Sequence, residues 1–304
     1  MKRQRSRPDV VKALRSRIDR LFLGALVALL GLTNNAWAAA TVETARFTVR
    51  DASGQLSEER ARDLASEAEK TLAKILQFWS ASPKIEEFGR IKLEFARPRK
   101  DTYSAVFYWA KEQGRKVRTL IVFGVNGEPQ MLAHKLTHAI FPNTDKMIRN
   151  MMGIPMEIKF GNRLTFPMCG FDNNAWVLAL QQLKSYIPLS ELGPNHEQWG
   201  MSTKGDLPIV VDPARQHAAY AESGSFGMYL LSVHGGEKVK RFNRLSRGGK
   251  ARPWVEVFGL PLKQLEARWL NTLEAGTTTK DVPLLSKLRS TDPATGCARA
   301  QEAA

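Results

Sequence analysis

Hydrophobic positions recur along the chain with two periods. Alternation of apolar and polar residues predicts strands over 44–50, 90–96 and 118–123. Apolar residues three and four apart predict a helix that begins after Ser57 and buries Leu64, Leu72 and Trp79 on one face. Further helices are predicted over 105–111, 131–141, a short stretch from Met156, 171–186, 216–245 with a stop at Gly235, and 262–273. The sequence has no internal repeat, and strands near the start followed by mostly helices indicate an α+β fold.

The first residues have a different pattern from the rest of the chain. Basic residues outnumber Asp9 and Asp19 before an apolar run at 21–32, and Ala36 and Ala38 then form a small-x-small site. The run is short for a membrane span, which favours a cleaved signal peptide at 1–38 over an anchor. The mature chain is then expected to be exported, into the periplasm or the medium.

Composition and charge narrow the function classes. The chain has 304 residues, is 43% hydrophobic and has a formal net charge of +15, part of which belongs to the predicted signal. Basic residues are not interleaved with aromatic ones, so nucleic-acid binding is not expected. An exported basic protein could associate with an anionic envelope surface, but a plain solvated surface is the better explanation of the charge. Cys169 and Cys297 could form a disulfide in such a compartment.

The stretch 131–141, MLAHKLTHAIF, carries the candidate chemistry. His134 and His138 lie four residues apart, so both imidazoles project from one face of the predicted helix. That spacing lets two ring nitrogens share one zinc ion. Glu157 follows His138 after 18 intervening residues. The alternative is that these side chains simply pack against their neighbours.

This arrangement resembles the HExxH-x18-E motif of gluzincin metallopeptidases, and the helices after residue 216 are similar to those of peptidase MA-like domains. The resemblance implies a zincin-like fold over 39–274, with a small N-terminal mixed sheet, an active-site helix, a mostly helical C-terminal half, and a loosely held tail at 275–304. It also implies zinc bound by His134, His138 and Glu157. An edge strand beside that helix would receive an extended peptide, and a loop over 191–213 would border the cleft.

One position departs from the motif. Lys135 occupies the place of the glutamate that takes a proton from the zinc-bound water, and an ammonium group cannot do this. The resemblance implies an oxyanion-stabilising role for Tyr220, although a core role is the simpler interpretation. Three hypotheses follow: an impaired peptidase that binds a peptide or protein partner in its cleft, an active zinc hydrolase with Lys135 as an altered base, and a structural envelope protein without metal.

Overall fold

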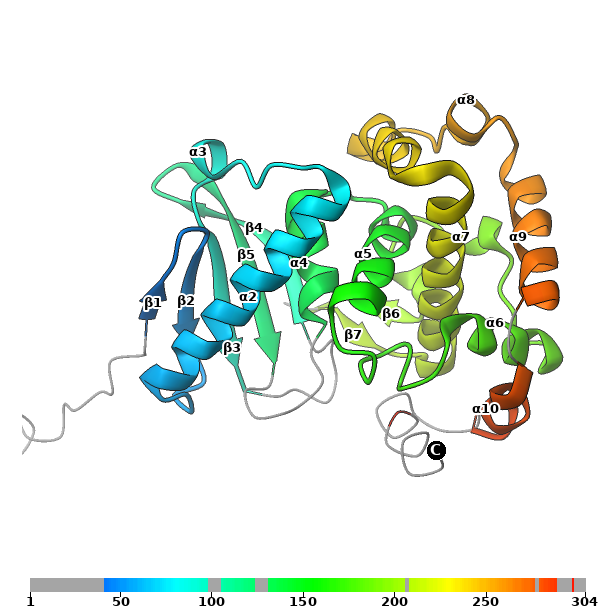
Figure 1. The fold of residues 1–304 in the computed structure, drawn as a ribbon, viewed down its shortest axis with the longest axis horizontal. Helices are drawn as coiled ribbons and strands as arrows, with labels where there is room; N and C mark the ends of the chain where they lie inside the picture. The colour runs from blue at the N-terminus through cyan, green and yellow to red at the C-terminus, as the bar shows by residue number, and fades with distance from the viewer. Residues whose placement is uncertain are drawn as a thin grey trace, which may run out of the picture. The chain divides into compact units, whose positions relative to one another are not determined.

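The computed structural model describes residues 41–97, 105–123, 131–205, 208–276, 279–288 and 297, which all belong to one compact unit that begins at Ala40. Five of its strands form a mixed sheet in the order β1-β2-β3-β5-β4 (Figure 1). Their bounds are β1 Thr41–Glu43, β2 Phe47–Asp51, β3 Ile91–Ala96, β4 Ala105–Glu112 and β5 Arg115–Phe123. The predicted signal peptide lies outside the described residues.

The three central strands run parallel to one another, and the two outer strands run antiparallel to their neighbours. Along β3, every second residue is buried, as the alternating sequence predicts. The connection from β2 to β3 passes through α2 (Glu58–Trp79), which lies across one face of the sheet (Figure 1). Ser57 caps α2 by accepting from the backbone N–H of Arg60. Both the cap and the buried face of this helix were predicted correctly.

The helix predicted over 105–111 is wrong, because these residues form the edge strand β4. Strands β4 and β5 make a hairpin in which Glu112 faces Arg115. The two residues of its turn, Gln113 and Gly114, both have positive φ values, as a type I′ turn requires. The aromatic and β-branched residues of the segment also suit a strand.

Two helices follow the sheet and lie against each other. Helix α4 (Leu132–Ile140) is the predicted histidine helix, and it contacts β4 and β5. Helix α5 (Lys146–Phe160) replaces the short helix predicted from Met156. It begins after the cap Asp145 and continues through Pro155, so Glu157 lies near its C-terminal end and not in its first turn. Pro155 has no backbone N–H, so α5 lacks one intrahelical hydrogen bond at this position.

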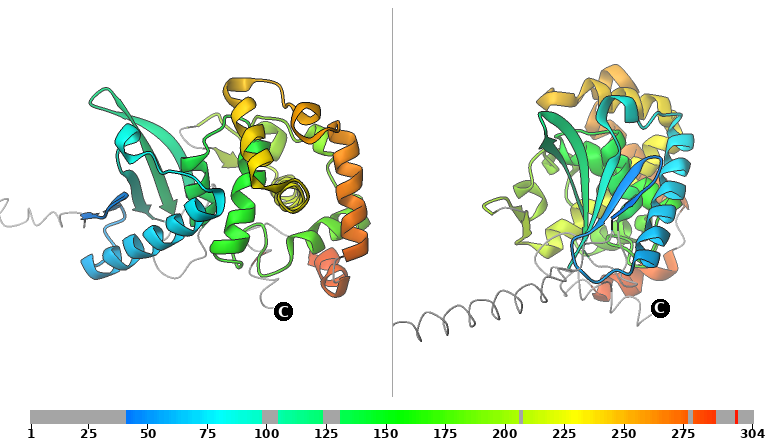
Figure 2. Two further views of the ribbon diagram at one scale, coloured as in Figure 1. Left: turned by 45° about the horizontal axis from the view of Figure 1, so that its top comes forward. Right: turned by 90° about the vertical axis from the view of Figure 1, so that its left-hand side faces the viewer.

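The C-terminal half is mostly helical, so the α+β class and the order of its parts are confirmed (Figure 2). The remaining helices are α6 Asn173–Gln182, α7 Pro213–Leu245, α8 Trp254–Phe258, α9 Leu262–Gly276 and α10 Val282–Leu288. A short α-helix, α3 Ile85–Phe88, precedes β3, and 3-10 turns lie at η1 Leu189–Glu191, η2 Glu197–Trp199, η3 Arg247–Gly249 and η4 Thr279–Asp281. Helix α7 is interrupted at Gly235, where the helix stop was predicted. The φ of 79° at this residue is one that glycine adopts readily.

Part of the predicted tail is packed. Helix α10 contacts α6, and Val282 and Leu285 are buried. Cys169 and Cys297 form a disulfide that ties this end of the chain to the segment before α6. The predicted loop over 191–213 holds short 3-10 turns and a two-stranded sheet of β6 (Met201–Ser202) and β7 (Ile209–Val210). No helix among the described residues is long and apolar enough to span a membrane.

Candidate functional site

The two histidines of α4 lie together, as the four-residue spacing predicts. Their ring centroids are 4.4 Å apart and the rings meet edge to face. Both side chains are buried, and His134 is fully so. The His138 Nε2 atom lies 3.0 Å from the Arg149 carbonyl oxygen. Because a carbonyl only accepts, His138 donates through Nε2–H, which fixes its neutral tautomer.

Glu157 is buried beside this pair, but its carboxylate serves the backbone. One oxygen accepts from the His134 backbone N–H at 2.8 Å and the other from the Asn162 N–H at 3.0 Å. His134 is in the first turn of α4, and the residue before that helix, Met131, makes no capping hydrogen bond with its side chain. Glu157 therefore caps α4 from a distant position in the sequence, and its negative charge suits the helix N-terminus.

These side chains do not fit the zinc site that the resemblance implies. Within the described residues, no three His, Cys, Asp or Glu side chains are arranged to hold a metal ion. Both Glu157 oxygens accept from backbone N–H groups, and the hydrogen bond from His138 Nε2–H to the Arg149 carbonyl leaves only Nδ1 of that ring with a free lone pair. His134 alone keeps both ring nitrogens buried without a hydrogen-bond partner in this part of the chain. Zinc binding stays a prediction of the motif, without support from the donor geometry.

Cationic side chains surround the histidines instead. Lys135 and Lys146 are 4% and 2% exposed, and Arg149 is half-buried one turn along α5 from Lys146. Burial, followed by the charges of Lys135 and Lys146, holds the pKa of His134 well below its usual value. Burial and the His134 and Lys135 charges do the same for the pKa of His138. Both imidazoles are therefore neutral near pH 7, and basic side chains lie around them.

Lys135 and Glu157 partly compensate each other. Burial lowers the pKa of Lys135 to about 7, with a smaller contribution from the Arg149 charge, and the Glu157 carboxylate opposes this fall. Burial raises the pKa of Glu157 to about 7, against the hydrogen bonds from Asn162 and His134 and the Lys135 charge. Burial thus destabilises the charged form of each group, and the opposite charge of the other group offsets part of this cost.

Lys146 is held by aromatic side chains. Its Nζ atom donates to the Tyr220 hydroxyl at 3.1 Å and lies 4.9 Å from the centre of that ring and 5.1 Å from that of Trp199. Both rings stabilise the ammonium by cation–π attraction. Burial, then the Arg149 and Lys135 charges, nevertheless keep the pKa of Lys146 well below normal. Tyr220 is thus buried, as expected of a core residue, and its hydroxyl also accepts the hydrogen bond from Lys146.

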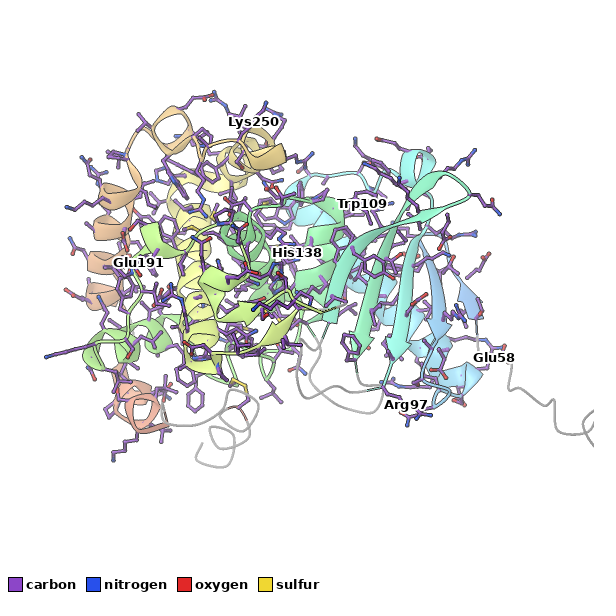
Figure 3. All side chains as sticks on the ribbon, turned by 180° about the vertical axis from the view of Figure 1, so that it is seen from behind. Glu58, Arg97, Trp109, His138, Glu191 and Lys250 are labelled. Carbon is purple, nitrogen blue, oxygen red and sulfur yellow. A yellow bond between two sulfur atoms is a disulfide. The ribbon has the colours of Figure 1, made fainter. Side chains whose placement is uncertain are left out.

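A cavity of about 480 Å³ lies between the edge strand and these helices. Its walls come from β4, β5, α4, α5, α7 and the 191–213 segment, through Val106, Phe107, Tyr108, Ile121, Lys135, His138, Lys146, Arg149, Asn150, His196, Pro208 and Tyr220. Figure 3 shows His138 between the sheet, where Trp109 marks β4, and the helical half of the molecule. The sequence analysis did not predict that Lys146 and Arg149 of α5 belong to the site. Two basic residues at the start of a largely apolar helix were the signal that could have identified them.

Comparisons with known proteins add no assignment. No family model matches the chain, and a search of the curated proteins finds no significant relative. The likeness to gluzincins depends only on the motif and on the arrangement of the helices.

Proposed function

We propose that this chain is an exported, gluzincin-like pseudo-peptidase that binds an extended peptide in the cleft between β4 and helices α4 and α5, without cleaving it. One observation carries the proposal: the cavity beside the edge strand is lined by Lys135, Lys146 and Arg149, and a general base of the peptidase type is missing from that position. The zincin-like fold is part of the same proposal.

The edge strand supplies the means of binding. Strand β4 is bordered by β5 on one side, and no other described strand pairs with it. Alternate residues of an antiparallel edge strand direct their backbone N–H and C=O groups away from the sheet, where an extended peptide can pair with them. Val106 and Phe107 of this strand line the cavity, so peptide side chains have an apolar wall.

Export is supported by two features. The basic, apolar and small-residue zones at the N-terminus follow the order of a secretory signal. The Cys169–Cys297 disulfide suits an oxidising compartment. Association with an anionic envelope surface also has a local basis, since a hollow of about 450 Å³ near the end of α7 is lined by Lys238, Arg244 and Arg247 among other residues.

A second candidate function is a zinc hydrolase in which Lys135 replaces the glutamate as the base. Its support is the lysine pKa of about 7, which makes neutral amine available near neutral pH. This mechanism also needs a metal-bound water, and the donor geometry around His134 and His138 does not supply three ligands. We therefore prefer the binding function.

Hydrogen–deuterium exchange tests the proposed cleft. With a saturating pool of synthetic hexapeptides, amides of β4 should exchange more slowly, because peptide pairing protects the free edge. Strand β1, the opposite edge of the same sheet, is the internal control and should not change. Equal exchange in β4 with and without peptide would contradict the proposal, and protection of β1 alone would place the binding edge elsewhere.

A further inference from the structure

The hollow of about 450 Å³ near the end of α7 gathers positive charge outside the peptide cleft. Five basic residues line it, namely Lys238, Lys240, Arg241, Arg244 and Arg247. Lys240, Arg241 and Arg244 are three or four residues apart on the last turns of the helix, so their side chains project from one side of it. We call this feature the basic hollow.

Two of these basic residues hold the wall of the hollow in place. The Lys240 Nζ atom lies 2.5 Å from Glu237 Oε1 and donates to the Trp79 carbonyl oxygen at 2.6 Å, which joins α7 to the end of α2. Arg241 forms a salt bridge of 2.9 Å with Glu256 of α8. The last turns of α7 are therefore fixed from two sides, so that the charged wall is formed before a ligand binds.

The other three basic residues, Lys238, Arg244 and Arg247, make no salt bridge with a carboxylate of the described residues. Arg244 is in the last turn of α7, where a positive charge suits the helix dipole, but Arg247 lies beyond the helix end. Burial, then the Arg244 charge, lowers the pKa of Arg247, so the two guanidinium groups repel each other. A bound anion removes this repulsion, which helix stability alone does not explain.

Phe141 gives the basic hollow an apolar part. This residue ends α4, is half-buried, and its ring centre lies 5.3 Å from that of Trp79. Guanidinium groups match the oxygens of a phosphate, and an aromatic ring beside them suits the hydrocarbon of an amphiphile. A volume of about 450 Å³ is also typical of a site for a small organic ligand and not of one for a bare ion. Figure 3 shows Lys250, which follows this segment, near the outer edge of the molecule.

We infer that the basic hollow binds the phosphate of an anionic phospholipid headgroup, with Arg244 and Arg247 at the phosphate oxygens and Phe141 beside the hydrocarbon. The inference rests on the proposed association with an anionic envelope surface, and it names the site and the lipid. It does not depend on peptide binding, because Phe141 and the basic residues of α7 are not among the residues that line the peptide cavity. The end of α7 then faces the lipid surface.

Vesicle co-sedimentation of the mature protein tests this inference. Vesicles of phosphatidylcholine alone should leave the protein in solution, and vesicles that also contain phosphatidylglycerol should carry it down. The double variant Arg244→Gln, Arg247→Gln should bind the anionic vesicles at least roughly tenfold more weakly, because each basic residue near an anionic surface strengthens binding by roughly fivefold. Arg244→Lys with Arg247→Lys keeps the charge but not the planar fork, so it should bind with an intermediate affinity.

The matched control is the double variant Arg60→Gln, Arg62→Gln, which removes the same charge from exposed positions near the start of α2. Arg60 is roughly 28 Å along that helix from Trp79, far beyond the roughly 10 Å over which salt screens charges. The control should change vesicle binding by less than about twofold. Melting curves show whether each variant is folded, and if the Arg244→Gln, Arg247→Gln protein is not, the single variant Arg247→Gln decides, since Arg247 is exposed and outside α7.

The outcomes separate this inference from the proposed function. Equal losses in the two glutamine double variants would mean that net charge alone attracts the protein, and they would overturn the inference. Binding to inorganic phosphate or to polyglutamate without binding to anionic vesicles would also overturn it, in favour of a free anion or an acidic protein. Hexapeptide protection of β4, measured on the same samples, should be unchanged in the Arg244→Gln, Arg247→Gln protein. If the natural protein binds anionic vesicles but no peptide, peptide binding fails and the lipid site stands.

Discussion

Replacing Glu157 by alanine distinguishes a helix cap from a metal ligand. The carboxylate accepts from the buried backbone N–H of His134 and from the partly buried N–H of Asn162. Each buried donor left unmatched costs about 1–3 kcal/mol. Removing a buried carboxyl group whose pKa is raised to about 7 returns part of that cost. Water can reach the Asn162 N–H, so one buried donor dominates, and we expect Glu157→Ala to lower the free energy of unfolding by about 1–3 kcal/mol.

Urea unfolding with and without a chelator is the assay. In the capping account the loss is the same in EDTA and in added zinc, because no metal contributes to it. In a metal-ligand account the natural protein also loses its metal in EDTA, so the difference between natural protein and variant disappears there. A difference that vanishes in EDTA would refute the capping argument.

Gly161 offers an independent check on the position of the carboxylate. A Cβ atom added at this residue would lie 2.2 Å from Glu157 Oε1, and the Gly161 φ of −103° puts no backbone strain on alanine. Gly161→Ala should therefore displace the Glu157 carboxylate from the start of α4. It should lower the stability of the natural protein more than it lowers the stability of the Glu157→Ala variant. Equal effects in the two backgrounds would mean that the carboxylate is not at this position.

Further predictions concern four other features. Lys135→Glu restores an HExxH sequence but not the third ligand, so a fluorogenic peptide assay with zinc should show no hydrolysis, and zinc-dependent cleavage would contradict this. Glu222 is fully buried, and burial raises its pKa well above normal. Above the pKa that Glu222 has in the unfolded chain, the folded protein still holds this proton and the unfolded chain does not, so the stability of the fold falls as the pH rises. Glu222→Gln should therefore stabilise the fold by roughly 1–3 kcal/mol in urea unfolding at pH 8 and by much less at pH 4. The same stabilisation at both pH values would contradict this. Serine at both Cys169 and Cys297 should cost about 2–4 kcal/mol, and no change in urea unfolding under oxidising conditions would argue against the disulfide. Mass spectrometry of the exported protein should show cleavage near Ala38, whereas retention of 21–32 would indicate an anchor.

Periodic segments of the fold could be predicted from the sequence because burial on one face is a local property of the pattern. Helix α2 and strand β3 have such patterns, and their bounds agree with the structure to within a residue. Strand β4 was mistaken for a helix because its burial does not alternate: Ala105 and Val106 are both buried, and the rest of the strand is half-buried or exposed. The Gln113–Gly114 turn was the missed signal, since glycine there allows a tight hairpin.

The chemistry of the site depended on tertiary contacts that spacing cannot reveal. The spacing predicted that His134 and His138 share a face, and this is confirmed. The direction of the Glu157 side chain was not predictable, because it depends on α5 continuing through Pro155 and on the start of α4, where Met131 provides no side-chain cap. Lys146 and Arg149 reach the cavity only because α5 packs against α4.

We propose that the cleft holds a peptide without a metal ion and without cleavage. The most direct test incubates the immobilised mature protein with a pool of synthetic hexapeptides in EDTA and, separately, in zinc, and then determines the masses of the retained and the released peptides. We expect the same intact peptides to be retained in both conditions and no fragments to accumulate. Peptide fragments that form only with zinc, or retention that disappears in EDTA, would contradict it.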